Sequence, residues 1–234
     1  FLSKLFHKNY TLLEDGFVRS IGLGVEGWDS FSIVKDDIGI YYDATVPSRV
    51  ENILNSHHFD EKILTQAKKA ISLIKQYKIS KYNNGSLFLP SYLNNKNKKV
   101  LIIAQTKGDM SLKYGLSTSA NDMVIDALKN DGYKVYLKIH PDVLSGKKES
   151  NIDINFAKKH CKVISENINP IVLLEVFDKV YTQTSQMGFE ALLLGKEVYI
   201  FGAPFYVGWG LENLKWYLDE NTKKEILKRR KKKL

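Results

Sequence analysis

The segment Val100-Leu101-Ile102-Ile103-Ala104 is an unbroken apolar run near the middle of a chain of 234 residues. Such a run suits a strand that is buried on both faces, as the central strands of parallel sheets are. Beyond it, strand-like and helix-like segments alternate as far as residue 201, which predicts a parallel sheet with helices on both faces. The further strands are expected at residues 134–139, 161–164, 179–182 and 197–201, and the helices at 119–129, 150–159, 170–176 and 187–194.

The first 58 residues have a different pattern, which is rich in strands and turns. Residues 31–34 and 40–42 flank a polar turn, and this arrangement predicts a hairpin. The Ser-x-x-Glu spacing at Ser48 is that of a capping box, so a short helix is expected to begin there. Apolar residues at helical spacing predict a second helix over residues 60–77 with one buried stripe.

These patterns divide the chain into four parts. We expect an N-terminal lobe over residues 1–80, followed by an exposed linker over 81–98 that is rich in Asn, Lys, Ser and Gly. A C-terminal Rossmann-like lobe is expected over residues 99–220, and a basic tail over 221–234. Because the chain begins at Phe1, we also expect it to be a piece of a longer polypeptide.

The composition excludes several classes of protein. With 44% apolar residues and a mean hydropathy of −0.26, the chain is not of the disordered class. No stretch without a charge is longer than 14 residues, and the more apolar one of that length, residues 198–211, is too short and too rich in Gly for a membrane span. The single cysteine, Cys161, excludes a disulfide framework and a zinc site built from cysteines. We therefore expect a soluble, cytoplasmic protein.

The positive charge is concentrated at one end of the chain. The net charge is +9, and residues 228–233 alone supply six of these charges. A nucleic-acid-binding protein needs basic residues spread over a face and interleaved with aromatic ones, so no nucleic acid partner is expected. The basic run is either a solvated tail or a site of peripheral attraction to an anionic membrane surface.

Polar residues follow the expected strands at their carboxyl ends, where open parallel sheets bind their ligands. Hydroxyls before a helix, with a glycine in its first turn, allow a phosphate to approach free backbone N–H groups at the positive end of the helix dipole. The same hydroxyls are equally suited to plain helix capping. The candidates are Gln105 after the first strand, Lys138, His140 and Pro141 after the second, and Thr184, Ser185, Gly188 and Glu190 after the fourth.

Two of these candidates each allow two interpretations. Glu190 has the wrong charge for a phosphate, so its carboxylate either accepts hydrogen bonds from ribose hydroxyls or is an ordinary acid in the first turn of a helix. His140 is either an ordered loop residue or, together with Lys138, a partner for the phosphate of a pyrimidine nucleotide. No metal site is expected, because the chain lacks an Asp-x-Asp motif and His57 and His58 are adjacent.

A second chemical cluster is Glu14-Asp15-Gly16 in the first region. Two acids and a glycine at the end of a strand often form only a turn. Paired carboxylates, however, push their pKa values apart, which suits acid–base or nucleophilic work at an anomeric carbon. Arg19 offers a fork to a substrate carboxylate. Because this cluster precedes the parallel sheet in the chain, we expect a cleft between two lobes.

Five blocks of sequence carry a resemblance to a known family. They are LEDGFVRSIGLG at residues 13–24, SIV through GIYYDA at 32–44, KIHPDV at 138–143, TSQMGFEAL at 184–192 and GAPFYVGWGL at 202–211. In this order they resemble the capsule-polysaccharide β-Kdo transferases of the KpsC type. The resemblance implies an α/β, glycosyltransferase-B-like fold with two Rossmann-like lobes and parallel sheets. Since the family has further strands before the first block, the N-terminal lobe is expected to be incomplete.

The resemblance also implies an activity. Members of the family are retaining glycosyltransferases that take Kdo, 3-deoxy-D-manno-oct-2-ulosonic acid, from CMP-β-Kdo. They build β-Kdo linkages on a lipid-borne linker or within capsule and related surface glycans. By this analogy the chain is a metal-independent bacterial enzyme without a cofactor, whose partners are CMP-Kdo and a glycan or glycolipid acceptor. It would work in the cytoplasm, at the inner face of the inner membrane.

Roles for individual residues follow from the same resemblance. Asp15 is the catalytic carboxylate of a double displacement, and Glu14 orients or assists it. If the reaction inverts instead, Asp15 is the general base toward the acceptor. The helix end, Lys138 and His140 stabilise the departing phosphate without a metal. The residues expected to bind the donor are Arg19 at the Kdo carboxylate and Gln105, Lys138, His140, Pro141, Thr184, Ser185, Gly188 and Glu190 around the rest.

Two alternatives stay open at this point. The acid–acid–glycine and His-Pro pairs also resemble those of bacterial sialyltransferases, so a transferase that uses CMP-sialic acid is the second enzymatic interpretation. An alternative from another class is a non-catalytic basic module that binds a membrane or a nucleic acid.

Overall fold

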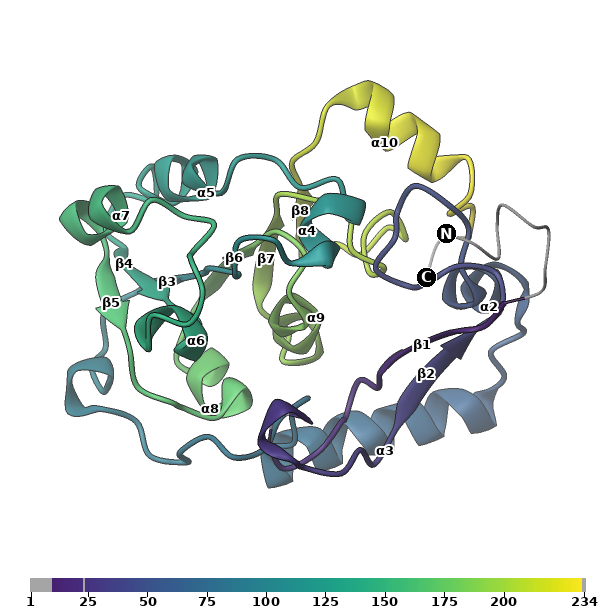
Figure 1. Ribbon diagram of the computed structural model, residues 1–234, viewed down its shortest axis with the longest axis horizontal. Coiled ribbons are helices and arrows are strands. Elements are labelled where there is room, and N and C mark those ends of the chain that lie inside the picture. Colours follow the sequence, from purple (N-terminus) through teal and green to yellow (C-terminus); the bar gives the residue numbers. More distant parts are fainter. Residues whose placement is uncertain (1–9, 23, 233–234) are drawn as a thin grey trace.

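A computed structural model describes residues 10–22 and 24–232 of the chain (Figure 1). The C-terminal lobe holds a six-stranded sheet in the order β5-β4-β3-β6-β7-β8, in which every neighbouring pair is parallel. The strands are β3 (Lys99–Ile103), β4 (Lys134–Lys138), β5 (Lys162–Ile164), β6 (Lys179–Thr182), β7 (Glu197–Ile200) and β8 (Leu214–Trp216). The five predicted strands are confirmed. The edge strand β8 was not predicted, because a segment of three residues shows no recognisable pattern.

Helices cover both faces of this sheet (Figure 1). All five residues of the central strand β3 are buried, and their side chains alternate between the two faces. Two of its apolar side chains pack in a cluster with α5 and α7, and two pack in a cluster with α8 and α9. The helices of this lobe are α4 (Met110–Tyr114), α5 (Ala120–Ala127), α6 (Pro141–Leu144), α7 (Ile154–His160), α8 (Pro170–Glu175) and α9 (Gln186–Leu193). The predicted parallel sheet with two covered faces is therefore confirmed.

The N-terminal lobe contains a two-stranded antiparallel sheet formed by β1 (Leu12–Asp15) and β2 (Ile33–Asp36). The short 3₁₀ helix η1 (Gly24–Glu26) lies in the loop between them. The hairpin predicted from residues 31–34 and 40–42 is wrong, because β2 pairs with β1 and residues 40–42 form no strand.

The Asp36 carboxylate explains why the chain does not fold back along β2. Its Oδ1 accepts hydrogen bonds from the backbone N–H groups of Ile38 and Gly39, at 2.9 and 3.0 Å. Its Oδ2 accepts a third hydrogen bond, 2.8 Å long, from the N–H of Arg49 at the start of α2. One buried side chain thus closes the turn and directs the chain toward the next helix, as aspartates commonly do in turns.

Both helices predicted for the N-terminal lobe are present. Helix α2 (Arg49–Ser56) begins after Ser48, whose side chain accepts a hydrogen bond from the N–H of Glu51 as the capping-box spacing predicts. Helix α3 (Glu61–Tyr77) is capped by Asp60. The buried stripe predicted for α3 is wrong, because none of its residues is buried and Leu64 is 48% exposed. In the described part of the chain, no helix is long and apolar enough to cross a membrane.

The segment expected to be an exposed linker, residues 81–98, contacts both lobes. Tyr82 forms a parallel bridge with Ser20 of the N-terminal lobe, and Ser86 forms one with Ile168 of the C-terminal lobe. The segment also contains the 3₁₀ helix η2 (Ser91–Leu93), whose Leu93 is fully buried. Much of the segment is exposed as expected, with Phe88 at 85%, but the two bridges and the buried Leu93 hold it against both lobes.

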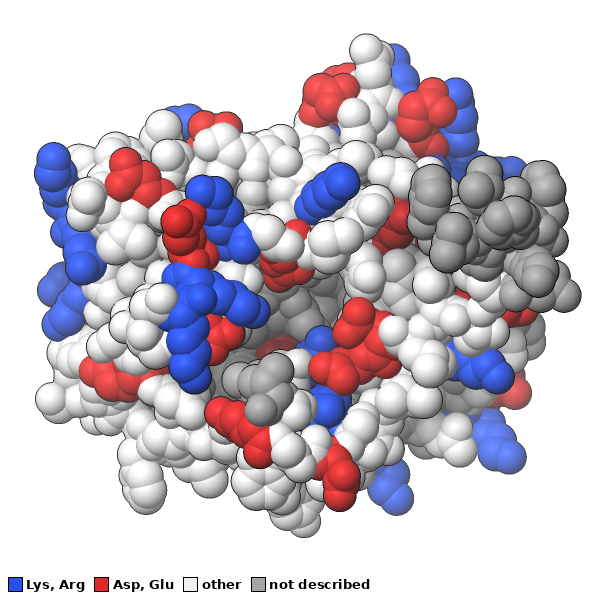
Figure 2. Space-filling model, in the orientation of Figure 1, with Lys and Arg blue, Asp and Glu red and all other residues white. Residues whose placement is uncertain are grey.

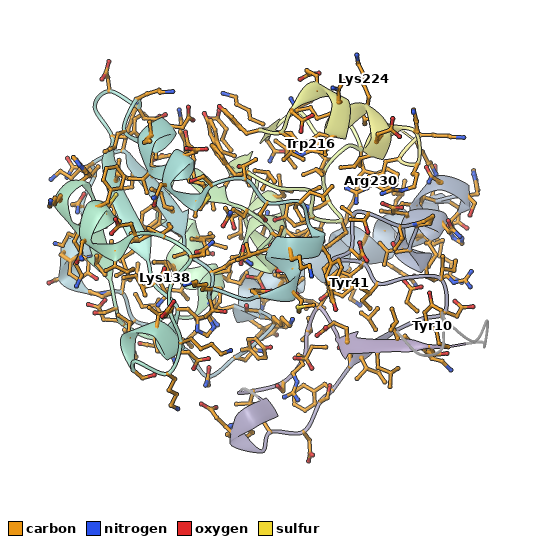
Figure 3. The ribbon with its side chains drawn as sticks, turned by 45° about the horizontal axis from the view of Figure 1, so that its top comes forward. Tyr10, Tyr41, Lys138, Trp216, Lys224 and Arg230 are labelled. Atoms are coloured by element: carbon orange, nitrogen blue, oxygen red, sulfur yellow. The ribbon has the colours of Figure 1, made fainter. Side chains whose placement is uncertain are left out.

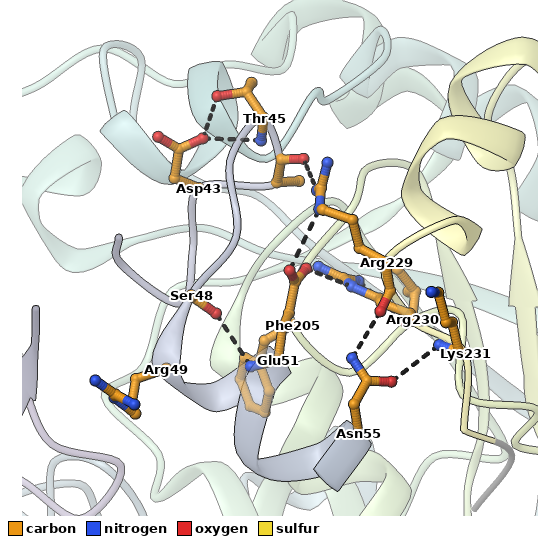
Figure 4. Close-up of polar contacts among 12 residues, drawn as sticks. Asp43, Thr45, Ser48, Arg49, Glu51, Asn55, Phe205, Arg229, Arg230 and Lys231 are labelled. Atoms are coloured by element: carbon orange, nitrogen blue, oxygen red, sulfur yellow. Dashed lines mark hydrogen bonds and ion pairs between the residues drawn. The ribbon is translucent and has the colours of Figure 1, made fainter. Parts of the chain in front are cut away.

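The C-terminal segment is not the solvated basic tail expected over residues 221–234. It begins with helix α10 (Glu220–Leu227), after which Arg229 and Arg230 both meet the buried carboxylate of Glu51 on α2 (Figure 4). Arg230 is 2% exposed, and its Nε donates to Glu51 Oε1 at 2.9 Å. Its Nη1 donates to the carbonyls of Pro204 and Val207. Part of the basic run therefore joins the lobes, while residues 233–234 lie outside the described residues.

We expect Glu51→Gln to destabilise the protein markedly. It leaves Arg230 buried without its counter-charge, and breaking a buried pair in this way costs about 3–5 kcal/mol. Urea unfolding followed by circular dichroism measures the change. The matched control is Glu220→Gln on α10, which breaks an exposed pair with Lys223 that should contribute less than about 1 kcal/mol. Equal stabilities of the two variants would contradict the joining role of Arg230.

Candidate active site in the cleft between the lobes

A cavity of about 610 Å³ lies between the lobes, and residues from both of them line it. It opens at the carboxyl ends of β3, β4 and β6, where ligands of parallel sheets bind. Figure 2 shows a hollow near the centre of the molecule, with acidic and basic side chains around it. The cavity brings together seven predicted site residues: Glu14, Gln105, Lys138, His140, Thr184, Ser185 and Glu190.

Lys138 is the last residue of β4, and it is 9% exposed. Its Nζ donates a hydrogen bond of 2.8 Å to the carbonyl oxygen of Glu166. Burial lowers the pKa of Lys138 to about 8, although the nearby Glu166 carboxylate opposes this shift. The side chain is therefore still mainly charged at pH 7, in a place where an anionic ligand would stabilise that charge.

His140 follows β4 and precedes helix α6, which Pro141 begins. Its Nδ1 accepts a hydrogen bond of 3.1 Å from the backbone N–H of Asp142. Burial lowers the pKa of His140, so the imidazole is mainly neutral at pH 7. Because Nδ1 is an acceptor, the neutral ring carries its proton on Nε2. The ring therefore presents an N–H donor rather than a full positive charge.

Ser185 is the N-cap of α9, where its side chain accepts a hydrogen bond from the N–H of Met187. The capping interpretation is thus correct, and the same residue also lines the cavity. Next to it, Gln105 Oε1 accepts from the N–H of Thr184, and Gln105 Nε2 donates to the hydroxyls of Thr184 and Ser111. These hydrogen bonds connect the loops after β3 and β6 beside the N-terminus of α9.

The position of Gly188 requires a glycine for a reason that differs from the predicted one. A Cβ at this position would lie 2.3 Å from the hydroxyl oxygen of Tyr206, whose O–H donates to the carbonyl of Ser185. Gly188 is not among the residues that line the cavity. The expectation that it admits a ligand to the helix backbone is therefore corrected: its missing side chain makes room for Tyr206.

Glu190 is a buried carboxylate on the cavity wall, 4% exposed. Its Oε1 accepts hydrogen bonds from the Ser80 hydroxyl at 2.7 Å and from the Lys81 N–H at 3.1 Å. Its Oε2 has no hydrogen-bond partner among the residues that the structure describes. Burial raises the pKa of Glu190 to about 7, although Ser80, Lys81 and Gln186 each lower it. Both protonation states are therefore available near neutral pH.

The two adjacent acids of β1 point in different directions, as successive residues of a strand do. Glu14 lines the cavity, whereas Asp15 is not among the lining residues. Asp15 Oδ1 accepts a hydrogen bond of 3.0 Å from Arg19 Nε, and its Oδ2 accepts one of 3.1 Å from the hydroxyl of Tyr82. Because Tyr82 itself lines the cavity, Asp15 lies one side chain behind the wall.

Arg19 does not meet the cavity, which contradicts the expectation that it binds a substrate carboxylate. The residue is 9% exposed, and its Nε is paired with Asp15. Its Nη1 donates to the Ser20 hydroxyl and to the carbonyl of Trp28, both at 2.8 Å. The guanidinium thus donates its hydrogen bonds to neighbouring residues of the N-terminal lobe, and the bond from Nε holds Asp15 in place.

Sequence reasoning missed several residues of the cavity wall. Tyr41 packs against Phe17 and Phe205, with ring centroids 5.1 and 5.6 Å apart, so aromatic rings from both lobes meet. Figure 3 shows Tyr41 and Lys138 on different lobes. Lys81 and Tyr82 lie in a segment that reads as a linker, and only its position between the lobes could have pointed to them. In the described ranges, no group of three or more His, Cys, Asp or Glu side chains is placed to hold a metal ion.

The chain is similar to several known proteins. The family described as capsule polysaccharide biosynthesis protein matches residues 7–93 and 86–234. The capsule polysaccharide modification protein LipA of Neisseria meningitidis serogroup A is 44% identical over 211 residues, which are 87% of this chain and 30% of LipA. The lipopolysaccharide-processing protein LpsZ of Rhizobium meliloti is 34% identical, over 94% of this chain and 53% of LpsZ. The chain thus spans only part of these curated relatives, from 30% of LipA to 53% of LpsZ.

Two solved structures from Thermosulfurimonas dismutans are also similar. One, described as KpsC, β-Kdo 2,4 transferase, is 41% identical with a TM-score of 0.87, and the match covers 99% of this chain and 70% of that one. The other, described as KpsC, β-Kdo 2,7 transferase, is 30% identical with a TM-score of 0.71, and the match covers 99% and 69%. These matches confirm the predicted fold class and the KpsC-type resemblance. The chain belongs to the capsule polysaccharide biosynthesis family.

Proposed function

We propose that the chain transfers Kdo from CMP-β-Kdo to a glycan or lipid-linked glycan acceptor during the assembly of a capsule or related surface polysaccharide. The observation that carries the proposal is a cavity shared by both lobes. In it the acidic segment Glu14-Asp15 of the N-terminal lobe presents Glu14 opposite Lys138, His140 and the capped N-terminus of α9. The similarity to two structures described as β-Kdo transferases supports Kdo as the sugar.

In this proposal the C-terminal lobe binds the CMP part of the donor. The phosphate is met by the Lys138 ammonium, by the Nε2–H of His140 and by the N-terminus of α9, which favours negative charge. These groups stabilise the charge that grows on CMP as it leaves, without a metal or another cofactor. The Oε2 atom of Glu190 is the acceptor that remains for the ribose hydroxyls.

Retention then requires two displacements at the anomeric carbon. In the first, a carboxylate oxygen of Asp15 forms a bond to this carbon while the bond to the phosphate oxygen breaks, and CMP leaves with the electron pair. In the second, an acceptor hydroxyl displaces Asp15 and gives its proton to a base. Glu14 lines the cavity and is available as this base. In an inverting reaction, Asp15 would itself take the proton of the acceptor.

The contacts of Asp15 suit a nucleophile that is held until the substrate arrives. Arg19 stabilises the ionised carboxylate, and Tyr82 covers its second oxygen. Attack requires that the Tyr82 hydroxyl release Oδ2 toward the sugar. A non-catalytic basic module would need its basic residues on the surface to bind a membrane or a nucleic acid. Arg230 of the basic run is buried, so it does not support this alternative. Cytoplasmic work with peripheral contact at the inner membrane remains a prediction.

We expect Asp15→Asn to lower the rate of Kdo transfer by about a thousandfold or more while CMP still binds, because the substitution removes the nucleophile and leaves the nucleotide site intact. CMP release from CMP-Kdo with an acceptor glycan measures the first quantity, and calorimetric titration with CMP measures the second.

Glu14→Gln is the matched control for this experiment, since it changes the neighbouring carboxylate, and a smaller loss of rate is expected. CMP-sialic acid is assayed in parallel with the wild-type protein. Normal turnover by Asp15→Asn would refute the role of Asp15, and transfer from CMP-sialic acid in place of CMP-Kdo would refute the choice of donor.

The affinity for CMP should fall as the pH rises, because Lys138 loses its positive charge. Below its pKa of about 8 the ammonium attracts the phosphate, and above that pH the attraction is lost. Bound phosphate raises this pKa further, so the dissociation constant should increase about tenfold between pH 7 and pH 9. Calorimetry at the two pH values measures it. In Lys138→Met the affinity should be weaker at pH 7 and nearly constant over this range; an unchanged pH dependence in that variant would exclude Lys138.

A further inference from the structure

Charge in the cavity is unevenly distributed. Of the residues that the structure describes, four carboxylate residues line it, together with two lysines, Lys81 and Lys138. If the proposed function is correct, the donor brings two anionic groups into this cavity, the phosphate of CMP and the carboxylate of Kdo. The acidic residues that line the cavity are Glu14, Glu26, Asp109 and Glu190.

The two anionic groups of the donor are bonded to the same carbon. In an activated 2-keto acid sugar, the anomeric carbon carries both the phosphate oxygen and the carboxylate. The cation that receives the carboxylate must therefore lie close to the nucleophile. Lys138 lies at the end of β4 beside His140, on the phosphate side, and Arg19 is enclosed in its own loop. Of the two lysines that line the cavity, this leaves Lys81.

The main chain of Lys81 is fixed from both lobes. Its N–H donates a hydrogen bond of 3.1 Å to Glu190 on α9 of the C-terminal lobe. Its carbonyl oxygen accepts hydrogen bonds from the N–H groups of Arg19 and Ser20 in the N-terminal lobe, at 3.0 and 3.2 Å. The residue therefore lies at the junction of the lobes, between the expected nucleotide site and the acidic segment.

The side chain of Lys81 is half-buried and forms no ion pair with another residue that the structure describes. Its Nζ lies 5.6 Å from the centroid of the Tyr82 ring, within the range of a cation–π interaction. No carboxylate of a described residue lies within 4.0 Å of this Nζ, although the charge of Lys81 lowers the pKa of Glu190 from a longer distance. The hydroxyl of the same Tyr82 donates to Asp15. Tyr82 thus contacts the Lys81 ammonium through its ring and the proposed nucleophile through its hydroxyl.

We propose that Lys81 binds the carboxylate of the donor sugar and so distinguishes an activated keto acid from a neutral nucleotide sugar. An ammonium–carboxylate hydrogen bond is charge-assisted and is stronger than a neutral one. Placed on the cavity wall beside Tyr82, it orients the anomeric carbon toward Asp15. The role that the sequence assigned to Arg19 thereby passes to Lys81.

The test compares the whole donor with its nucleotide part. In Lys81→Gln the KM for CMP-Kdo should rise about ten- to hundredfold, because a charged hydrogen bond is lost, while the Ki of CMP stays within about twofold. Lys81→Arg should restore most of the affinity for CMP-Kdo. The matched control is Lys98→Gln, since the Lys98 ammonium lies 5.5 Å from the ring centroid of Tyr133 but does not line this cavity.

The outcomes separate the inference from the function on which it rests. Equal increases of KM and Ki in Lys81→Gln, or no increase in either, would overturn the role of Lys81 and leave the proposed function standing. Thermal unfolding of each variant checks that the fold is retained. A wild-type protein that binds neither CMP nor CMP-Kdo would contradict the proposed function, and the inference with it.

Discussion

The Glu190 carboxylate, buried on helix α9, connects the parallel sheet to the acidic segment of the other lobe. One of its oxygens accepts the N–H of Lys81, whose carbonyl accepts the N–H of Arg19, whose guanidinium in turn pairs with Asp15. Three residues thus link the proposed nucleophile to the carboxyl end of the sheet, where we propose that the nucleotide binds. The buried pair of Glu51 and Arg230 holds the lobes together from a second place in the fold.

Burial governs the electrostatics of the cleft. It lowers the pKa of Lys138 and of His140 and raises that of Glu190, so in each case the neutral form is favoured. For Glu190, the raised pKa limits the like-charge repulsion that an anionic donor would meet in a cavity lined by four acids of the described residues. The lowered pKa values of Lys138 and His140 reduce the attraction instead. The remaining positive potential comes from two lysines and one helix end, which matches a ligand with a phosphate and one carboxylate.

Local features of the fold could be predicted from the sequence, whereas long-range ones could not. The apolar run of β3 and the capping box at Ser48 depend on neighbouring residues, and both predictions were correct. The hairpin failed because Asp36 bonds to a helix start 13 residues away. Motifs predicted that His140 and Ser185 line a pocket, but the enclosure of Arg19 and the position of Lys81 on the cavity wall depend on contacts between distant segments. No local pattern carries that information.

The central claim is that a nucleotide occupies the cleft between the acidic segment and the carboxyl end of the sheet. A crystal structure of the protein with CMP tests it most directly. We predict that the CMP phosphate lies within hydrogen-bond distance of Lys138 Nζ, His140 Nε2 and the N-terminus of α9. The side of the phosphate that would carry the sugar should face Glu14 and Tyr82. CMP bound elsewhere on the surface, or a phosphate that contacts none of these groups, would contradict the account.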